Sequence, residues 1–142
     1  MDSEALKKLV TGFISEMNAW EKKCEKISDS EDNDEDVDDE WEEMEKKVHE
    51  IFSRFCTPKD RKQGRPNVIS WGSEGSYDYD PKEELIKDTV EEKAGRFLVY
   101  TYREKPLKTS FCYVILETKG KLRIDSKKRK FNVSDKWEND YL

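Results

Sequence analysis

Histidine is almost absent from this sequence, since His49 is the only one in 142 residues. A catalytic set or metal site that needs two histidines is therefore excluded. Because His49 neighbours an apolar stripe of helical spacing, we interpret it as a structural residue at the core boundary. No residue stands out as catalytic, and we expect a protein that is not an enzyme.

Cysteine is also scarce: Cys24, Cys56 and Cys112 are odd in number and have no CxxC spacing. Each lies in a stretch that reads as core, which predicts reduced, buried thiols in a reducing compartment. The N-terminus lacks a basic region followed by an apolar one, and no run of about eighteen apolar residues occurs anywhere. We expect a cytoplasmic protein with no membrane association.

Hydrophobic residues are few, at 34% against 42% charged. The core must be thin, although 6 Tyr, 6 Phe and 4 Trp compensate with large buried areas. The length predicts one domain over residues 1–142. The net charge of -6 argues against binding nucleic acid and favours a protein partner with a basic surface. No cofactor is expected.

Two stretches near the N-terminus, residues 3–27 and 37–55, have apolar residues at the three-four spacing of amphipathic helices. Gly12 lowers the helix propensity of the first stretch but does not interrupt its three-four spacing of apolar residues. Glycine-punctuated strand patterns follow at residues 85–91, 97–103, 111–118 and 122–131, which predicts an antiparallel meander with tight turns. The order of these elements predicts an α+β fold with N-terminal helices packed on a curved antiparallel sheet.

Residues 29–45, called the acidic segment from here on, contain twelve Asp and Glu residues and no Lys or Arg. We expect a solvated loop at its start and the first turn of the second helix at its end. One interpretation is a surface that docks a basic partner, and the other is a loop that contacts nothing. A calcium loop is disfavoured because Val37 stands where a glycine is needed and Asp39 where an apolar residue is needed. The partner-binding candidates here are Asp32, Asp34, Glu35, Asp36, Asp38 and Asp39.

Residues 58–80 form an irregular connector that contains Trp71, Tyr77 and Tyr79 among glycines and serines. Such a composition suits a binding loop, because Tyr and Trp give large contact areas at low entropic cost. The alternative is that these aromatic rings fill the open end of the sheet. The basic run 127–130 has two interpretations as well: it contacts phosphate, or it blocks pairing at an edge strand.

Five stretches have a combination of residues that points to a known family: Phe55–Lys59, Tyr77–Pro81, Tyr113–Leu116, Lys121–Asp125 and Asp135–Glu138. Together they resemble the bacterial immunity proteins of nuclear-transport-factor-2-like fold that accompany polymorphic toxins. Leu122 departs from the resemblance, because such proteins often have Trp there, and the acidic segment is not part of it.

The resemblance implies a cone-shaped fold and an antitoxin that neutralises a cognate toxin domain by stoichiometric occlusion, with a nuclease as one candidate toxin. Two alternatives stay open: a small-molecule binder or isomerase-like enzyme of the same cone, and a general protein-interaction domain. Catalysis would draw on Asp78, Asp80 or Asp125, although turn formation explains these acids more simply. Pairing of two copies through the sheet is also left open.

Overall fold

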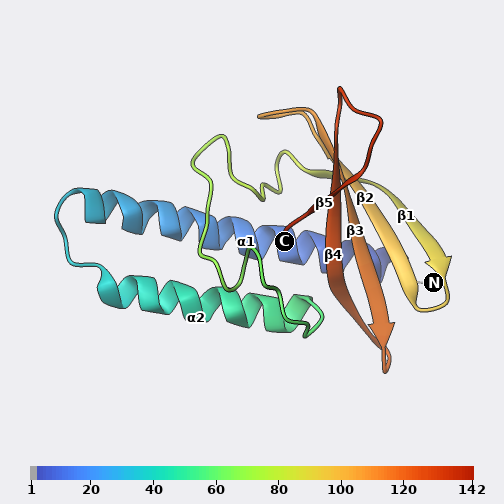
Figure 1. Ribbon diagram of the computed structural model, residues 1–142, viewed down its shortest axis with the longest axis horizontal. Helices are drawn as coiled ribbons and strands as arrows, with labels where there is room; N and C mark the ends of the chain where they lie inside the picture. The colour runs from blue at the N-terminus through green and yellow to red at the C-terminus, as the bar shows by residue number, and fades with distance from the viewer. Residues whose placement is uncertain (1–2) are drawn as a thin grey trace.

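The computed structural model describes residues 3–142. A hairpin of two helices covers one face of a five-stranded antiparallel sheet (Figure 1). The helices are α1 (Ser3–Asp32) and α2 (Asp38–Phe55), and the strands follow later in the chain. The predicted α+β architecture is confirmed.

Helix α1 is five residues longer than the apolar pattern predicts, so the acidic segment does not begin as a loop. The extra turn is held by hydrogen bonds at its end, one of which runs from Asn33 Nδ2 to the carbonyl oxygen of Asp29. Only residues 33–37 connect the helices. The acids at the start of α2 lie at the positive end of the helix dipole, as expected.

The two helices approach each other closely at Gly12. A Cβ atom at this position would lie 3.0 Å from the Phe55 ring, so a larger residue would require that ring to shift. The rings of Phe13 and Phe52 meet edge to face at 5.7 Å, and Trp20 Nε1 donates a 2.9 Å hydrogen bond to the Met44 carbonyl oxygen. Close packing explains why a glycine interrupts the helical sequence pattern.

The sheet contains β1 (Leu85–Lys93), β2 (Arg96–Arg103), β3 (Thr109–Thr118), β4 (Lys121–Phe131) and β5 (Glu138–Asp140), in chain order. The first four strands and their tight glycine turns are confirmed, with a positive φ of 77° at both Gly95 and Gly120. The short strand β5 was not predicted.

Strand β5 corrects the interpretation of the basic run 127–130. Lys127, Lys128 and Arg129 pair with β5, so this part of β4 is not an edge. The Lys127 side chain is only 4% exposed and lies inside the molecule. It neither blocks an edge nor presents a charge to phosphate.

The core fills the space between the helices and the concave face of the sheet. Its largest fully buried side chains include Trp20, Tyr79, Tyr113 and Phe13. From the end of α2 the chain runs back across both helices before it reaches β1 (Figure 1). The opposite face of the sheet is not covered by a helix (Figure 1).

Candidate functional site

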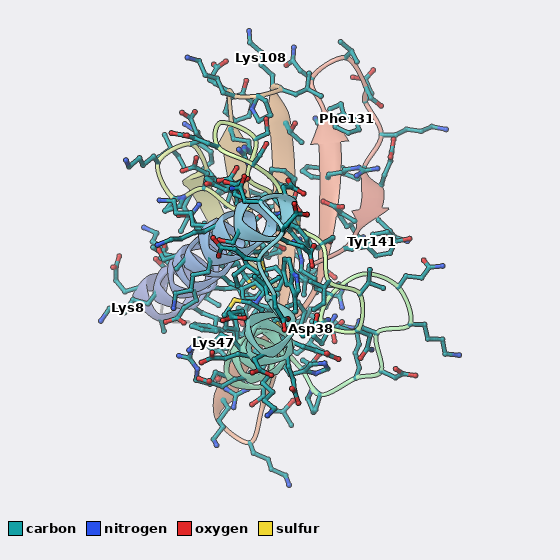
Figure 2. The ribbon with its side chains drawn as sticks, turned by 90° about the vertical axis from the view of Figure 1, so that its left-hand side faces the viewer. Lys8, Asp38, Lys47, Lys108, Phe131 and Tyr141 are labelled. Carbon is teal, nitrogen blue, oxygen red and sulfur yellow. The ribbon has the colours of Figure 1, made fainter. Side chains whose placement is uncertain are left out.

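The acidic segment forms the end of the helix hairpin that lies farthest from the sheet (Figure 1). Figure 2 looks onto this end, where Asp38 is labelled. No Lys or Arg within residues 3–142 forms an ion pair with an acid of the segment. All six candidate acids, Asp32, Asp34, Glu35, Asp36, Asp38 and Asp39, are exposed.

Two tryptophans order the base of this charged end. The Trp41 ring packs against the Trp71 ring at 4.9 Å between centroids, and Trp41 Nε1 donates a 3.2 Å hydrogen bond to Glu31 Oε2. Both rings are half-buried. Trp71 therefore lies beside the acidic segment, and part of its ring is open to a partner.

Tyr77 and Tyr79 lie elsewhere, because their side chains point into the protein. Tyr79 is fully buried, with its ring edge to face with Phe13 at 5.2 Å. Tyr77 is 7% exposed, and its hydroxyl donates a hydrogen bond to Glu25. Both side chains are buried, so Tyr79 has no surface to offer a partner and Tyr77 has little.

A buried carboxylate, Glu21 on α1, holds the connector in place. It accepts backbone N–H hydrogen bonds from Gly72, Asp78 and Tyr79 at 2.8 to 2.9 Å. Burial raises the pKa of Glu21, and these three donors oppose that effect. The burial of Glu21 could have been predicted from the sequence, because Glu21 lies at helical spacing from Met17 and Cys24 on the buried stripe of α1.

A second polar group in the interior was not predicted either. Glu84 is 5% exposed and accepts hydrogen bonds from Thr101 Oγ1 at 2.6 Å and from the Tyr113 hydroxyl at 2.7 Å. Lys127 Nζ lies 4.4 Å from the ring centroids of both Tyr79 and Phe111. A buried ammonium among aromatic rings is a stable arrangement, because the ring faces carry negative potential.

The acids proposed for catalysis are engaged in structural contacts. Asp78 pairs with Arg65 at 3.0 Å, and Asp80 accepts a hydrogen bond from the backbone N–H of Lys82. Burial opposes the ionisation of Asp125, but hydrogen bonds from Thr57 and Lys59 outweigh it and lower its pKa. A general acid working near neutral pH needs a raised pKa, so Asp125 does not suit that role.

Cys24, Cys56 and Cys112 are free and buried, as predicted. Within residues 3–142, no cluster of His, Cys, Asp or Glu side chains is arranged to hold a metal ion. None of the described helices is long and apolar enough to cross a membrane.

The protein is thus a helix hairpin packed on a meander sheet, with an exposed acidic end. The family model of NTF2 fold immunity proteins matches residues 5–141, and the chain belongs to this family. It is also 31% identical to the immunity protein RhsIA of Dickeya dadantii (strain 3937) over 130 residues, which are 92% of this chain and 90% of that protein. No solved structure gives a significant match.

Family membership confirms the resemblance that the sequence motifs indicated. The protein is therefore an antitoxin of the polymorphic toxin type, and its partner is a cognate toxin domain. Leu122, where Trp was expected, is half-buried against the core and does not disturb the fold.

Proposed function

We propose that the chain neutralises its toxin by stoichiometric occlusion, without catalysis, by docking the acidic segment onto a basic surface of the toxin domain. The observation that carries this proposal is the exposure of Asp32, Asp34, Glu35, Asp36, Asp38 and Asp39 with no Lys or Arg paired to the segment among the described residues. The half-exposed Trp71 ring beside it supplies apolar contact area. A partner with Lys and Arg side chains complements both features.

The high charge density of the acidic segment should increase the rate at which the protein associates with the toxin. Charges on a surface act over a Debye length of about 8–10 Å at physiological salt. Complementary surfaces attract each other over this distance and speed association, and added salt removes the effect. A nuclease fits best as the toxin, because an enzyme that binds nucleic acid presents clustered Lys and Arg to phosphates.

The proposal assigns no catalytic role to the carboxylates of the interior. Glu21 and Glu84 accept hydrogen bonds from backbone and hydroxyl donors and do not line the cavity described below. The two acids that do line it, Asp78 and Asp140, are paired with basic side chains. A cone-fold isomerase would need an acid or base that faces its substrate. Occlusion of the toxin requires only a surface that binds it.

The test compares two variants of the same charge. In the first, the six candidate acids of the acidic segment, Asp32, Asp34, Glu35, Asp36, Asp38 and Asp39, are changed to Asn or Gln. In the control, six exposed acids from outside the segment are changed in the same way: Asp60, Asp88, Glu91, Glu104, Glu117 and Asp135. Each protein is co-expressed with the cognate toxin domain, and binding is measured by titration at low and high salt.

We expect the segment variant to lose rescue of growth and to bind the toxin at least tenfold more weakly at low salt, while the control keeps both. Equal loss in the two variants would mean that net charge acts without a specific surface. Full activity of the segment variant would show that the toxin binds elsewhere. Failure of the unchanged protein to bind the toxin would overturn the occlusion mechanism itself.

We also propose that two copies pair through the uncovered face of the sheet. The Tyr100 ring on β2 lies there against Trp137 at 5.9 Å, and Trp137 is 40% exposed. This face also carries Val90, which is 36% exposed. Burial of these apolar side chains between two copies stabilises a dimer and leaves the acidic segments free.

A further inference from the structure

A cavity of about 330 Å³ opens beside the filled part of the cone. Its walls come from residues 64–78, the β2–β3 loop, the last part of β4 and the C-terminal segment. Phe131 and Tyr141 belong to these walls and are labelled in Figure 2. The volume lies within the roughly 300–1,000 Å³ of small-molecule sites.

The cavity is richer in cations than in anions. Four basic side chains line it, but only two acidic ones, Asp78 and Asp140, do so. Asp78 pairs with Arg65 at 3.0 Å, whereas Asp140 is shared between Lys127 at 3.7 Å and Arg129 at 3.4 Å. The remaining basic side chain, Arg103, has no acidic partner within residues 3–142.

Arg103 is a buried cation without a counter-ion. It is 4% exposed, and its hydrogen bonds go only to the carbonyl oxygens of Lys105 at 2.8 Å, Tyr77 at 2.9 Å and Asp78 at 3.1 Å. Arginine does not release its proton in proteins, so the charge persists inside. A buried charge is costly unless it is paired, and an anion in the cavity would supply the missing partner.

Arg129 also lines the cavity, and one of its donors lacks a partner. Its Nε atom is buried and has no hydrogen-bond partner among the described residues. Guanidinium groups match the planar geometry of a carboxylate, which accepts two parallel N–H hydrogen bonds. Two arginines therefore line one pocket: Arg103 has no acidic partner, and Arg129 has one donor without a hydrogen bond among the described residues.

The other part of the wall is apolar. Pro106, Leu107, Phe111 and Phe131 line it, and Leu107 is 59% exposed at the rim. A small hydrated ion would leave these side chains without contacts. The cavity thus combines a cationic wall with an apolar one.

We propose that this cavity binds a carboxylate group carried on an apolar body, with Arg103 and Arg129 contacting the carboxylate and Leu107 and Phe131 contacting the body. Two sources have this chemistry: a free small organic acid, or an acidic side chain of the toxin next to an apolar one. The second source rests on the proposed function, and the first does not.

The first experiment titrates benzoate, acetate and inorganic phosphate into the protein by calorimetry. We expect saturable 1:1 binding of benzoate, and weaker binding of acetate and phosphate because neither can use the apolar wall. Arg103→Gln and Arg129→Gln each lower benzoate affinity at least tenfold. The matched control is Arg96→Gln at the other end of β2, where the side chain pairs with Glu92 outside the cavity and binding stays unchanged.

The second experiment measures affinity for the toxin domain at high salt, where long-range attraction is screened. If the carboxylate comes from the toxin, Arg103→Gln and Arg129→Gln weaken the toxin complex at least tenfold while Arg96→Gln does not; if it comes from a free organic acid, the two variants lose benzoate affinity but bind the toxin as tightly as the unchanged protein. The unchanged protein in the same titration reports on the proposed function independently. Melting curves identify any variant that fails to fold, and Arg129→Gln, which loses no bond to backbone, serves if Arg103→Gln does not fold.

The inference is overturned if none of the three anions binds saturably and both arginine variants bind the toxin as tightly as the unchanged protein. It is also overturned if Arg96→Gln weakens binding as much as Arg103→Gln, since the effect would then follow from net charge alone.

Discussion

The Glu21 carboxylate on α1 accepts a 2.9 Å hydrogen bond from the backbone N–H of Tyr79, which is 58 residues away in the sequence. The N–H groups of Gly72 and Asp78 bond to the same carboxylate. One side chain thus satisfies three donors of an irregular connector that has no regular strand or helix to do so. The position of Trp71, and with it the base of the acidic end, depends on this anchor.

Glu21→Gln should lower the free energy of unfolding by about 2–3 kcal/mol, because an amide group would turn a donor toward a backbone N–H and leave it without an acceptor. Urea unfolding followed by circular dichroism measures this change. The matched control is Glu16→Gln on the same helix, whose partly exposed pair with Arg54 at 2.8 Å contributes about 0–1 kcal/mol. Equal losses in the two variants would contradict the anchoring role of Glu21.

Local patterns predicted the elements of this fold, since helices and strands express their periods in neighbouring residues. Contacts between residues far apart in the sequence leave no such periodic pattern, so they could not be predicted. The run 127–130 looked like an exposed basic cluster at an edge, but its first three residues pair with the three-residue strand β5 and Lys127 is buried. Three residues are too few to display a period, so β5 and its effect on Lys127 could not be predicted.

Some residues of the candidate site could be predicted and others could not, again because contacts between distant residues leave no local sequence pattern. The acids near Asp36 and Asp38 are exposed whatever the tertiary structure, and their charge alone indicated it. Whether an aromatic side chain points in or out depends on what packs over it, so Trp71, Tyr77 and Tyr79 could not be told apart. The unpaired Arg103 also escaped notice, because a missing counter-ion is visible only in three dimensions.

Burial lowers the pKa of Lys127, although Glu84 and Asp140 oppose this effect. In the pH range between the folded pKa and the usual lysine pKa, the unfolded chain binds the extra proton, so the free energy of unfolding rises with pH. Relative to Lys127→Met, the unchanged protein should therefore gain stability as the pH rises toward the usual lysine pKa of about 10.4, by at most about 1.4 kcal/mol per pH unit. Urea unfolding of both proteins across this range measures the difference, and a constant difference would contradict the prediction.

The thiols of Cys24 and Cys56 should be inert in the folded protein. Burial raises the pKa of both to about 12, and the thiolate is the reactive form. At pH 8 the reagent DTNB should label neither within minutes, but should label all three cysteines in 6 M guanidinium chloride. Rapid reaction of Cys56 in the native protein would show that the core opens far more often than its packing indicates.

Pairing of two copies through the sheet predicts a concentration-dependent mass. Sedimentation equilibrium of the unchanged protein should give a dimer at tens of micromolar, and Tyr100→Glu should give a monomer, because the new carboxylate would be buried without a partner. Toxin binding should survive this change, since the acidic segment lies at the other end of the molecule. A monomer at every concentration would remove the dimer proposal and leave the occlusion mechanism intact.

Trp71→Ala tests whether the ring beside the acidic segment contacts the toxin. Interface tryptophans often dominate binding, so we expect at least tenfold weaker toxin affinity, measured by titration calorimetry. Loss of the ring contact with Trp41 should also lower the free energy of unfolding by about 1 kcal/mol, which leaves the protein folded.

The matched control is Trp137→Ala, which removes a ring that is also partly exposed but packs against Tyr100 on the sheet. Its toxin affinity should stay within twofold of the unchanged protein. If Trp71→Ala binds as tightly as Trp137→Ala, the Trp71 ring serves only to hold Trp41 and its hydrogen bond to Glu31 in place. The toxin contact would then be purely electrostatic, and raising the salt concentration should abolish binding instead of merely slowing association.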